Sequence, residues 1–281
     1  KEPRISYYRD KEKNEIDLIM EKKVFGYPEF DENGEEILST YDNEYRDMLM
    51  DVRVYRLKEN ETRRFYREGE ETAVLLLSGD VEFSYGSHKE TVHRTDVFTD
   101  GPYALHVCTG REIEVKAVTG SEILVQCTHN DTVFESKLYT PDDAPWVYSS
   151  VGKFGNVAKR RVNTIFDKDI APWSNMVLGE VLNDRGNWSG YLPHRHPQPE
   201  LYYFKFDRPE GFGASFVGDQ VFKSVDNSFS AITPEALHPQ SAAPGFQMYT
   251  CWMIRHLDGN PWLQTTRNED AAYIWLHDAE F

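Results

Sequence analysis

The sequence predicts an all-β protein built from two β-barrels or sandwiches, and three observations support this. Short apolar runs recur along most of the chain, and turns rich in Gly, Asp and Ser separate them at intervals of about 8–12 residues, the spacing typical of barrels and sandwiches. Long stretches with the periodicity of an amphipathic helix are missing from the sequence. The apolar runs also form two sets, separated by a connector that carries prolines.

The first set of predicted strands follows a charged N-terminal stretch. Residues 1–48 are rich in charge, with a turn signal at Asp31–Gly34 and a short helix predicted around Asn43–Leu49. The predicted strands that follow are Val52–Leu57, Thr72–Leu77, Val81–Tyr85, Thr91–Phe98, Ala104–Cys108, Glu112–Val118 and Glu122–Thr128.

A connector and a second set of strands make up the rest of the chain. Residues 129–175 carry prolines at 141, 145 and 172, and we place the boundary here, between a first unit (1–145) and a second unit (146–281). The predicted strands of the second unit are Met176–Leu182, Gly190–His196, Glu200–Phe206, Ala214–Val217, Gln220–Val225, Phe229–Ile232 and Phe246–Ile254. The mixed tail, 255–281, is expected to pack on the second barrel through Trp262 and Trp275.

Composition and charge exclude several classes of function. The chain has 281 residues and a formal net charge of −16. Such an acidic protein is not expected to bind nucleic-acid phosphates or anionic membranes, because both require clustered positive charge. The three cysteines (108, 127 and 251) are far apart and odd in number, which favours a reducing cytoplasm over a disulfide framework. The apolar runs are too short to span a membrane, and the first residues lack the apolar core of a secretory signal.

The stretch from Gly186 to His238 carries the residues most typical of a metal site. His194, His196 and Glu200 form an H-x-H-x3-E arrangement, and His238 follows further along the chain. Alternate side chains of a strand share a face, so the two imidazoles of the pair are expected to point the same way. Three imidazoles and a carboxylate suit one divalent ion with open coordination positions, and they fit Zn, Mn or Fe without identifying which.

The two halves of the chain resemble a weak internal duplication. Glu70–Gly79 corresponds to His194–Phe206, and Asp96–His106 corresponds to Asn227–His238. The first half lacks the H-x-H pair, and its histidines are expected at the surface or in the core: His88, His93 and His106. We therefore expect a metal-free first barrel that serves as scaffold, pocket wall or interface, including the interface of a homo-oligomer.

The H-x-H-x3-E and P-x3-H elements are similar to the two metal-binding motifs of the cupin superfamily. More narrowly, the chain resembles the bacterial 5-deoxy-glucuronate isomerase family of myo-inositol catabolism. The matching stretches are TDVFTDGP (95–102), RRVNTI (160–165), LGEV and GNWSGYLPHRH (within 178–196), E-x-YY-x-x-FD-x-PEGF (200–212) and ITPEALHPQSAAPG (232–245). The resemblance implies a bicupin, two cupin-like β-barrels (double-stranded β-helix) in one chain, with a metal in the C-terminal barrel. By position, it implies the ligands His194, His196, Glu200 and His238.

Two departures from the family lie beside the predicted metal site. The usual proteins have a longer acidic insert between the H-x-H pair and the glutamate, which is shortened here to Pro197–Pro199. A charged DDRSLDE-like stretch is replaced by VGDQVFKSVDN (217–227). The compact spacing is closer to that of the related 4-deoxy-5-ketouronate isomerases of pectin breakdown, so the departures leave the substrate open.

The resemblance implies a metal-dependent aldose–ketose isomerisation of a deoxy uronic acid, from 5-deoxy-glucuronate to 2-deoxy-5-keto-gluconate. The metal ion would act as a Lewis acid on the carbonyl, and a general base or proton relay is expected nearby. Strand phase and position suggest four candidates for the relay: Tyr202, Gln240, Tyr249 and Glu180. The substrate carboxylate requires a cation, and the candidates are Arg161 and Lys205.

Three alternatives to this function remain open at the level of sequence. They are an isomerase of another uronic acid such as 4-deoxy-5-ketouronate, an Fe(II) dioxygenase of the cupin type, and a non-catalytic protein that binds sugar acids. An oxygenase would consume oxygen and require Fe(II), whereas an isomerase would work without oxygen. In each case the expected partner is a small sugar acid.

Overall fold

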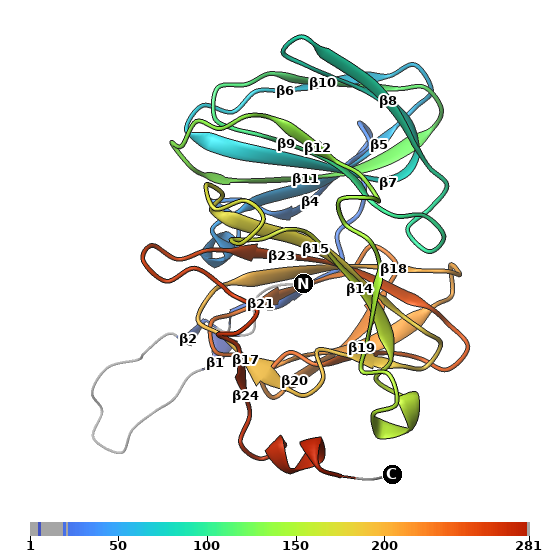
Figure 1. The fold of residues 1–281 in the computed structure, drawn as a ribbon, viewed down its shortest axis with the longest axis vertical. Coiled ribbons are helices and arrows are strands. Elements are labelled where there is room, and N and C mark those ends of the chain that lie inside the picture. Colours follow the sequence, from blue (N-terminus) through green and yellow to red (C-terminus); the bar gives the residue numbers. More distant parts are fainter. Residues whose placement is uncertain (1–4, 7–18, 21, 280–281) are drawn as a thin grey trace.

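The chain folds into two β-barrels stacked one on the other, as the computed structural model in Figure 1 shows. The structure describes residues 5–6, 19–20 and 22–279, so most of the charged first 18 residues lie outside the described part. The helices of the described part are three short 3-10 segments: η1 (Arg46–Met48), η2 (Phe154–Asn156) and η3 (Ile274–His277). None of them is long or apolar enough to cross a membrane. The prediction of an all-β protein is confirmed.

The first barrel is built from a nine-stranded sheet, whose main path runs β12-β9-β7-β11-β5-β4. Its strands are β4 (Glu35–Ser39), β5 (Asp51–Leu57), β6 (Thr62–Phe65), β7 (Glu70–Tyr85), β8 (His88–Arg94), β9 (Tyr103–Val107), β10 (Ile113–Ala117), β11 (Ser121–His129) and β12 (Lys137–Tyr139). The long strand β7 pairs with β11 and β9 before Gly79, and with β8 and β10 from Gly79 onward. Gly79 has φ +99°, a conformation that glycine adopts without strain, and it lets one strand serve both sets of neighbours.

The second barrel combines a seven-stranded sheet, β13-β14-β15-β23-β18-β21-β3, with a four-stranded sheet, β16-β22-β19-β20. The larger sheet contains β3 (Phe25–Gly26), β13 (Val147–Ser149), β14 (Arg160–Phe166), β15 (Met176–Asn183), β18 (Glu200–Phe206), β21 (Phe229–Ile232) and β23 (Met248–Arg255). The smaller sheet contains β16 (Trp188–Ser189), β19 (Phe212–Val217), β20 (Gln220–Val225) and β22 (Gln240–Ala242). Two short pairs complete the fold: β1 (Ile5–Ser6) with β2 (Ile19–Met20), and β17 (His194–Arg195) with β24 (Asn268–Glu269).

The two barrels repeat one strand order, which gives the predicted duplication a structural basis. The path β4-β5-β11-β7-β9 of the first barrel corresponds to β14-β15-β23-β18-β21 of the second, and every neighbouring pair is antiparallel. Strand β7 therefore takes the place of β18, as the alignment of Glu70–Gly79 with His194–Phe206 predicts.

Three apolar cores hold the molecule together: one inside each barrel and one between the barrels. Side chains alternate on β18, where Tyr202 and Phe204 belong to the core of the second barrel and Leu201 and Tyr203 belong to the core between the barrels. The seven-stranded sheet is consequently buried on both faces. Each fully buried apolar side chain in these layers contributes about 1.5–3 kcal/mol to folding.

The strand predictions fail mainly near the H-x-H pair and in the connector. The prediction of a strand over Gly190–His196 is wrong for most of its length, because only His194–Arg195 pairs within the described chain. Pro193 and Pro197 flank this pair and have no N–H to donate to a neighbouring strand. The connector contains three strands that were not predicted from the sequence: β12, β13 and β14. The prediction of a strand to Phe98 also overruns, since β8 ends at Arg94.

The pairing passes from the first barrel to the second between β12 and β13, the interval that contains the proposed boundary at 145/146. One early segment crosses over, because β3 pairs with β21 and the amide of Ala231 donates to the carbonyl of Val24. The tail packs on the second barrel through Trp262, which is buried in its core. The same expectation is wrong for Trp275, which is exposed.

Candidate metal centre and its cavity

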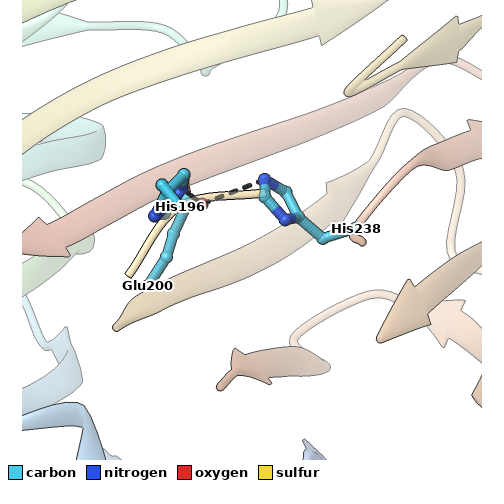
Figure 2. A group of neighbouring side chains, drawn as sticks. All are labelled: His196, Glu200 and His238. Carbon is cyan, nitrogen blue, oxygen red and sulfur yellow. Dashed lines mark hydrogen bonds and ion pairs between the residues drawn. The ribbon is translucent and has the colours of Figure 1, made fainter. Parts of the chain in front are cut away.

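Three of the four predicted metal ligands converge inside the second barrel. His196 follows β17, Glu200 begins β18, and His238 lies in the loop between β21 and β22. Each residue offers a ligand atom, and these atoms lie within 4.8 Å of one another (Figure 2). All three side chains are buried. The fold thus brings together residues from three separate segments of the chain.

The imidazoles are oriented by the backbone. The Nδ1 atom of His196 lies 2.9 Å from the carbonyl oxygen of Gln198, and that of His238 lies 2.8 Å from the carbonyl of Ala236. A carbonyl oxygen only accepts, so the hydrogen-bond network assigns the proton of both rings to Nδ1. Each Nε2 therefore presents a lone pair to Glu200. Holding a ligand histidine by its other nitrogen is a common arrangement around protein metal ions.

The contacts at the centre fit a bound cation. The Nε2 atoms of His196 and His238 lie 3.1 and 3.4 Å from Oε2 of Glu200. Two ligands of one metal ion, each about 2.0–2.2 Å from it, are separated by about 3.0–3.5 Å. With the protons on Nδ1, all three atoms are acceptors, so they repel one another unless a proton or cation lies between them. In addition, Nε2 of His238 is buried and has no hydrogen-bond partner in the described chain.

His194 stands beside this group rather than within it. Its ring centroid lies 4.7 Å from that of His238 and 6.5 Å from that of His196. Its Nδ1 lies 2.9 Å from the carbonyl oxygen of Leu192, the same type of contact that the other two rings make. The role of His194 as a fourth ligand remains a proposal.

Burial favours the neutral form of these imidazoles. It is the main reason that the pKa of His194 lies well below its usual value and that the pKa of His238 is lowered. For His194, the neighbouring His238 ring acts in the same direction. The neutral imidazole is the form that binds metal ions.

The group faces a cavity of about 490 Å³, large enough for a small sugar acid. His194, His196, Glu200 and Tyr202 line it, together with side chains from β14, β23 and the tail. The tail reaches the cavity because β24 pairs with β17, placing Glu269 opposite His194. The tail therefore forms part of the cavity wall.

Two of the four candidate relay residues lie inside the second barrel. Tyr202 lines the cavity, and burial together with the Glu200 carboxylate raises its pKa well above 10. Gln240 is buried in the barrel, where its amide nitrogen donates to Oγ1 of Thr250 at 3.3 Å.

The other two relay candidates, Glu180 and Tyr249, face the first barrel rather than the cavity. The prediction that they act as relay residues is therefore corrected. Both carboxylate oxygens of Glu180 accept hydrogen bonds from Arg94, at 2.8 and 3.1 Å. The hydroxyl of Tyr249 donates to the same carboxylate at 2.6 Å. Glu180 lies on a strand that is buried on both faces. The hydrophobic pattern of the sequence therefore could not show whether its side chain faces the cavity or the other barrel.

The predicted substrate cations also lie on the face that contacts the first barrel. Lys205 bonds Glu122 at 2.6 Å and the side chain of Asn227 at 2.9 Å. Arg161 donates to the carbonyl of Phe98 and lies over the ring of Trp146. The prediction that Arg161 and Lys205 bind the substrate carboxylate is therefore corrected, because neither side chain lines the cavity.

Two other arginines line the cavity, and neither was predicted from the sequence. Arg160 is the neighbour of Arg161 on the alternate face of β14, and Arg267 comes from the tail immediately before β24. Recognising β14 as a strand would have shown that Arg160 and Arg161 point to opposite faces. The sequence holds no comparable signal for Arg267, because its position depends on the long-range pairing of β24 with β17.

Comparison with known proteins identifies relatives over most of the chain. The sequence matches the model of the KduI/IolB family over residues 26–276. The 5-deoxy-glucuronate isomerase of Geobacillus kaustophilus (strain HTA426) is 29% identical over 213 residues, which cover 70% of this chain and 75% of the relative. The 5-deoxy-glucuronate isomerase of Bacillus subtilis (strain 168) is 25% identical over 230 residues, covering 74% and 80%.

Solved structures share the fold at lower sequence identity. The crystal structure of an IolB-like protein from Salmonella typhimurium LT2 matches with a TM-score of 0.78 and 16% identity, covering 91% of this chain and 99% of the other. The oxalate decarboxylase of Lactobacillus farciminis, in its formate complex, matches with a TM-score of 0.61 and 10% identity, covering 92% and 91%. At such identities the likeness concerns the fold, which is the bicupin expected from the sequence.

Proposed function

The chain belongs to the KduI/IolB family, and from this premise we propose that it converts 5-deoxy-glucuronate to 2-deoxy-5-keto-gluconate. The coarser activity, isomerisation of a sugar acid, is the one for which its curated relatives are named. The identity of the sugar acid is the proposed part. Conversion of the aldose to the ketose moves a proton from the second carbon to the first, and it moves the hydroxyl proton of the second carbon to the former aldehyde oxygen. The carbonyl is then on the second carbon.

One observation carries the proposal: the buried group of His196, Glu200 and His238 at the wall of a cavity. Its lone pairs converge within 4.8 Å, and the Nε2 of His238 has no hydrogen-bond partner among the described residues. A site of this kind suits chemistry on an oxygen-rich ligand, because imidazole and carboxylate donors leave positions open on the ion they bind.

We propose that these three residues, with His194 beside them, hold one divalent ion, with Zn, Mn and Fe as the candidates. Such an ion, when bound, supplies Lewis-acid polarisation of a carbonyl oxygen and lowers the cost of negative charge that develops on it. The imidazoles contribute by remaining neutral, which burial favours, and by staying fixed through their Nδ1 contacts with the backbone.

Tyr202 is the residue that we propose for proton movement at the cavity. It lines the cavity two residues after Glu200 on β18, and its ring also packs in the apolar core of the second barrel. Its hydroxyl can hold or pass a proton at the oxygen atoms of a bound sugar, a contribution worth about 10²–10⁴-fold in rate. Gln240 is buried in the same barrel, where its amide nitrogen donates to Thr250, and an amide is not a base that could accept the proton.

The test is a proton NMR time course under nitrogen, with metal-loaded protein and 5-deoxy-glucuronate in D2O. We expect the aldehyde signal to be replaced by signals of the ketose, and solvent deuterium at the reacting carbon would indicate an exchangeable ene-diol. A parallel sample contains 4-deoxy-5-ketouronate, and a third holds protein from which the metal has been removed by a chelator.

Each outcome separates the candidates. Conversion of 5-deoxy-glucuronate by the metal-loaded sample alone supports the proposal. Conversion of only 4-deoxy-5-ketouronate would move the substrate to the other sugar acid. Absence of conversion under nitrogen, followed by oxygen consumption in air with Fe(II), would overturn the isomerase in favour of an oxygenase. Tight binding without either reaction would favour a sugar-acid binding protein.

A further inference from the structure

Arg160 is a buried cation without a counterion. Its side chain lines the cavity, and the residue is 8% exposed. Its guanidinium contacts three neutral oxygen atoms: Oγ of Ser150 at 3.1 Å, the carbonyl of Ala158 at 2.9 Å and the carbonyl of Tyr191 at 3.4 Å. Ion pairs join many arginines of the described chain to carboxylates, but none of them involves Arg160. A buried charge that stays unpaired is costly, so a site of this kind favours an anionic ligand.

Arg94 provides an internal comparison for this cation. It is fully buried at the contact between the barrels, where both of its terminal nitrogens bond the carboxylate of Glu180. The protein therefore supplies a carboxylate to its other deeply buried arginine. Arg160 has no such carboxylate partner within the described residues, and its side chain faces the cavity instead.

Arg267 brings a second positive charge to the same cavity. It lines the cavity from the tail, which is held in place by the β24–β17 pair and by the amide of Asp270 donating to the carbonyl of Pro193 at 3.0 Å. The acidic side chains that follow it have other partners, Glu269 with His277 and Asp270 with Arg195. Within the described chain Arg267 makes no ion pair of its own.

The two arginines are close enough to influence each other electrostatically. Burial lowers the pKa of Arg160 to about 10, and the positive charge of Arg267 acts in the same direction. The chain as a whole carries a net charge of −16, so two unpaired arginines in one cavity run against its overall charge. Like charges at close range are unfavourable alone and become favourable when an anion lies between them.

We propose that Arg160 and Arg267 together bind the carboxylate of the sugar acid, in the cavity that the metal group also faces. The inference rests on the proposed function for its choice of ligand, and it makes the C-terminal tail part of the substrate site. The planar guanidinium donates two parallel hydrogen bonds to a carboxylate, which an uncharged hydroxymethyl group cannot match. The two arginines then select sugar acids over neutral sugars.

The test measures binding of two ligands that cannot be isomerised. One is 5-deoxy-glucuronate reduced at its aldehyde, which keeps the carboxylate. The other is the corresponding alditol, in which the carboxylate is reduced as well. Calorimetric titration of the metal-loaded protein gives the dissociation constant of each ligand. We expect the acid to bind about 10–100-fold more tightly than the alditol, the range that charge-assisted hydrogen bonds supply.

The variants are Arg160→Gln and Arg267→Gln, with Arg161→Gln as the matched control on the opposite face of β14. Each of the first two should lose about tenfold or more in affinity for the acid and leave the affinity for the alditol almost unchanged. The control should keep the wild-type preference. Because Arg160 is buried, Arg160→Lys is added as a variant that keeps the charge, and thermal melting verifies that every variant is folded.

The outcomes distinguish this inference from the proposed reaction. If the wild type does not prefer the acid, or if both glutamine variants keep the preference, the assignment of the carboxylate site is overturned, even where NMR shows isomerisation. If the preference depends on the arginines but 5-deoxy-glucuronate is not converted, the carboxylate site stands and the proposed reaction is the part that fails.

Discussion

The two barrels share a strand order and differ in what their interiors contain. Glu70 begins β7 and Glu200 begins the corresponding strand β18. In the first barrel the protein supplies a cation, because Arg67 lies 3.7 Å from Glu70 and 3.2 Å from Asp51. In the second barrel Glu200 faces two imidazole nitrogens instead. The comparison shows that the fold provides the position, and that a few side chains at one end of the barrel decide whether it becomes a site.

The first barrel contributes in another way, through its contact with the second. Arg94 and Glu122 from the first barrel pair with Glu180 and Lys205 from the second, at 2.8 and 2.6 Å. These pairs lie on the face of the seven-stranded sheet opposite to the cavity. The first barrel therefore packs against one face of this sheet, and the opposite face lines the cavity.

The largest expected effect separates the histidines of the two barrels. His196→Ala removes one of the three converging donors, so we expect loss of bound metal and of isomerase turnover while the fold is retained. The measurements are metal content per chain by mass spectrometry, circular dichroism and the NMR assay.

His106→Ala is the counterpart in the first barrel, where His106 bonds Glu71 at 2.8 Å. It should keep the metal and lose about 1–3 kcal/mol of stability. Full metal content and turnover in His196→Ala would show that the site is wrongly placed.

A second comparison concerns two tyrosines on the two faces of the same sheet. Tyr202→Phe removes a hydroxyl from the cavity, and kcat should fall by about 10²–10⁴-fold with the metal still bound. Tyr249→Phe removes the hydroxyl that bonds Glu180 at 2.6 Å, so its main effect should be a loss of about 1–3 kcal/mol in the free energy of unfolding. Steady-state kinetics and urea unfolding of both variants decide the matter. Equal kinetic effects would contradict the division of the sheet into two functional faces.

The third comparison sets a paired arginine against an unpaired one. Arg94→Met leaves the Glu180 carboxylate buried without its partner, which should cost about 3–5 kcal/mol in urea unfolding. The double variant Arg94→Met/Glu180→Met should recover most of this loss, since both charges are then removed. Arg160→Gln in the second barrel should cost less, because its contacts are with neutral oxygen atoms. An equally large loss at Arg160 would mean that it has a structural counterion.

A further expected effect is a pH dependence of stability at the contact between the barrels. Burial, with the nearby Glu122 carboxylate, raises the pKa of Glu36 from 4.5 to about 8, while Lys205 and Arg56 oppose the shift. The folded state then holds a proton that the unfolded state releases, so this stabilisation is complete below pH 4.5 and is lost as the pH rises through about 8. Thermal melts across this range should show a steeper decline for the wild type than for Glu36→Gln. Parallel curves would contradict the raised pKa.

The amino-acid sequence by itself determined the architecture and pointed to the residues of the proposed metal group. Alternating short strands predict barrels because an extended chain exposes its side chains to two faces in turn. His196, Glu200 and His238 were selected because imidazole and carboxylate groups at this spacing suit a divalent ion. These properties depend on local pattern and residue type, and both can be read from the chain.

Only the tertiary structure decided which face of each strand lines the cavity. The seven-stranded sheet is buried on both sides, so hydrophobic pattern alone could not show that Tyr202 faces the cavity while Tyr249 and Glu180 face the other barrel. The same ambiguity led to Arg161 in place of Arg160. Arg267 was beyond reach for a different reason: its place depends on the pairing of the tail with β17, a contact between residues more than 70 positions apart, which no local pattern encodes.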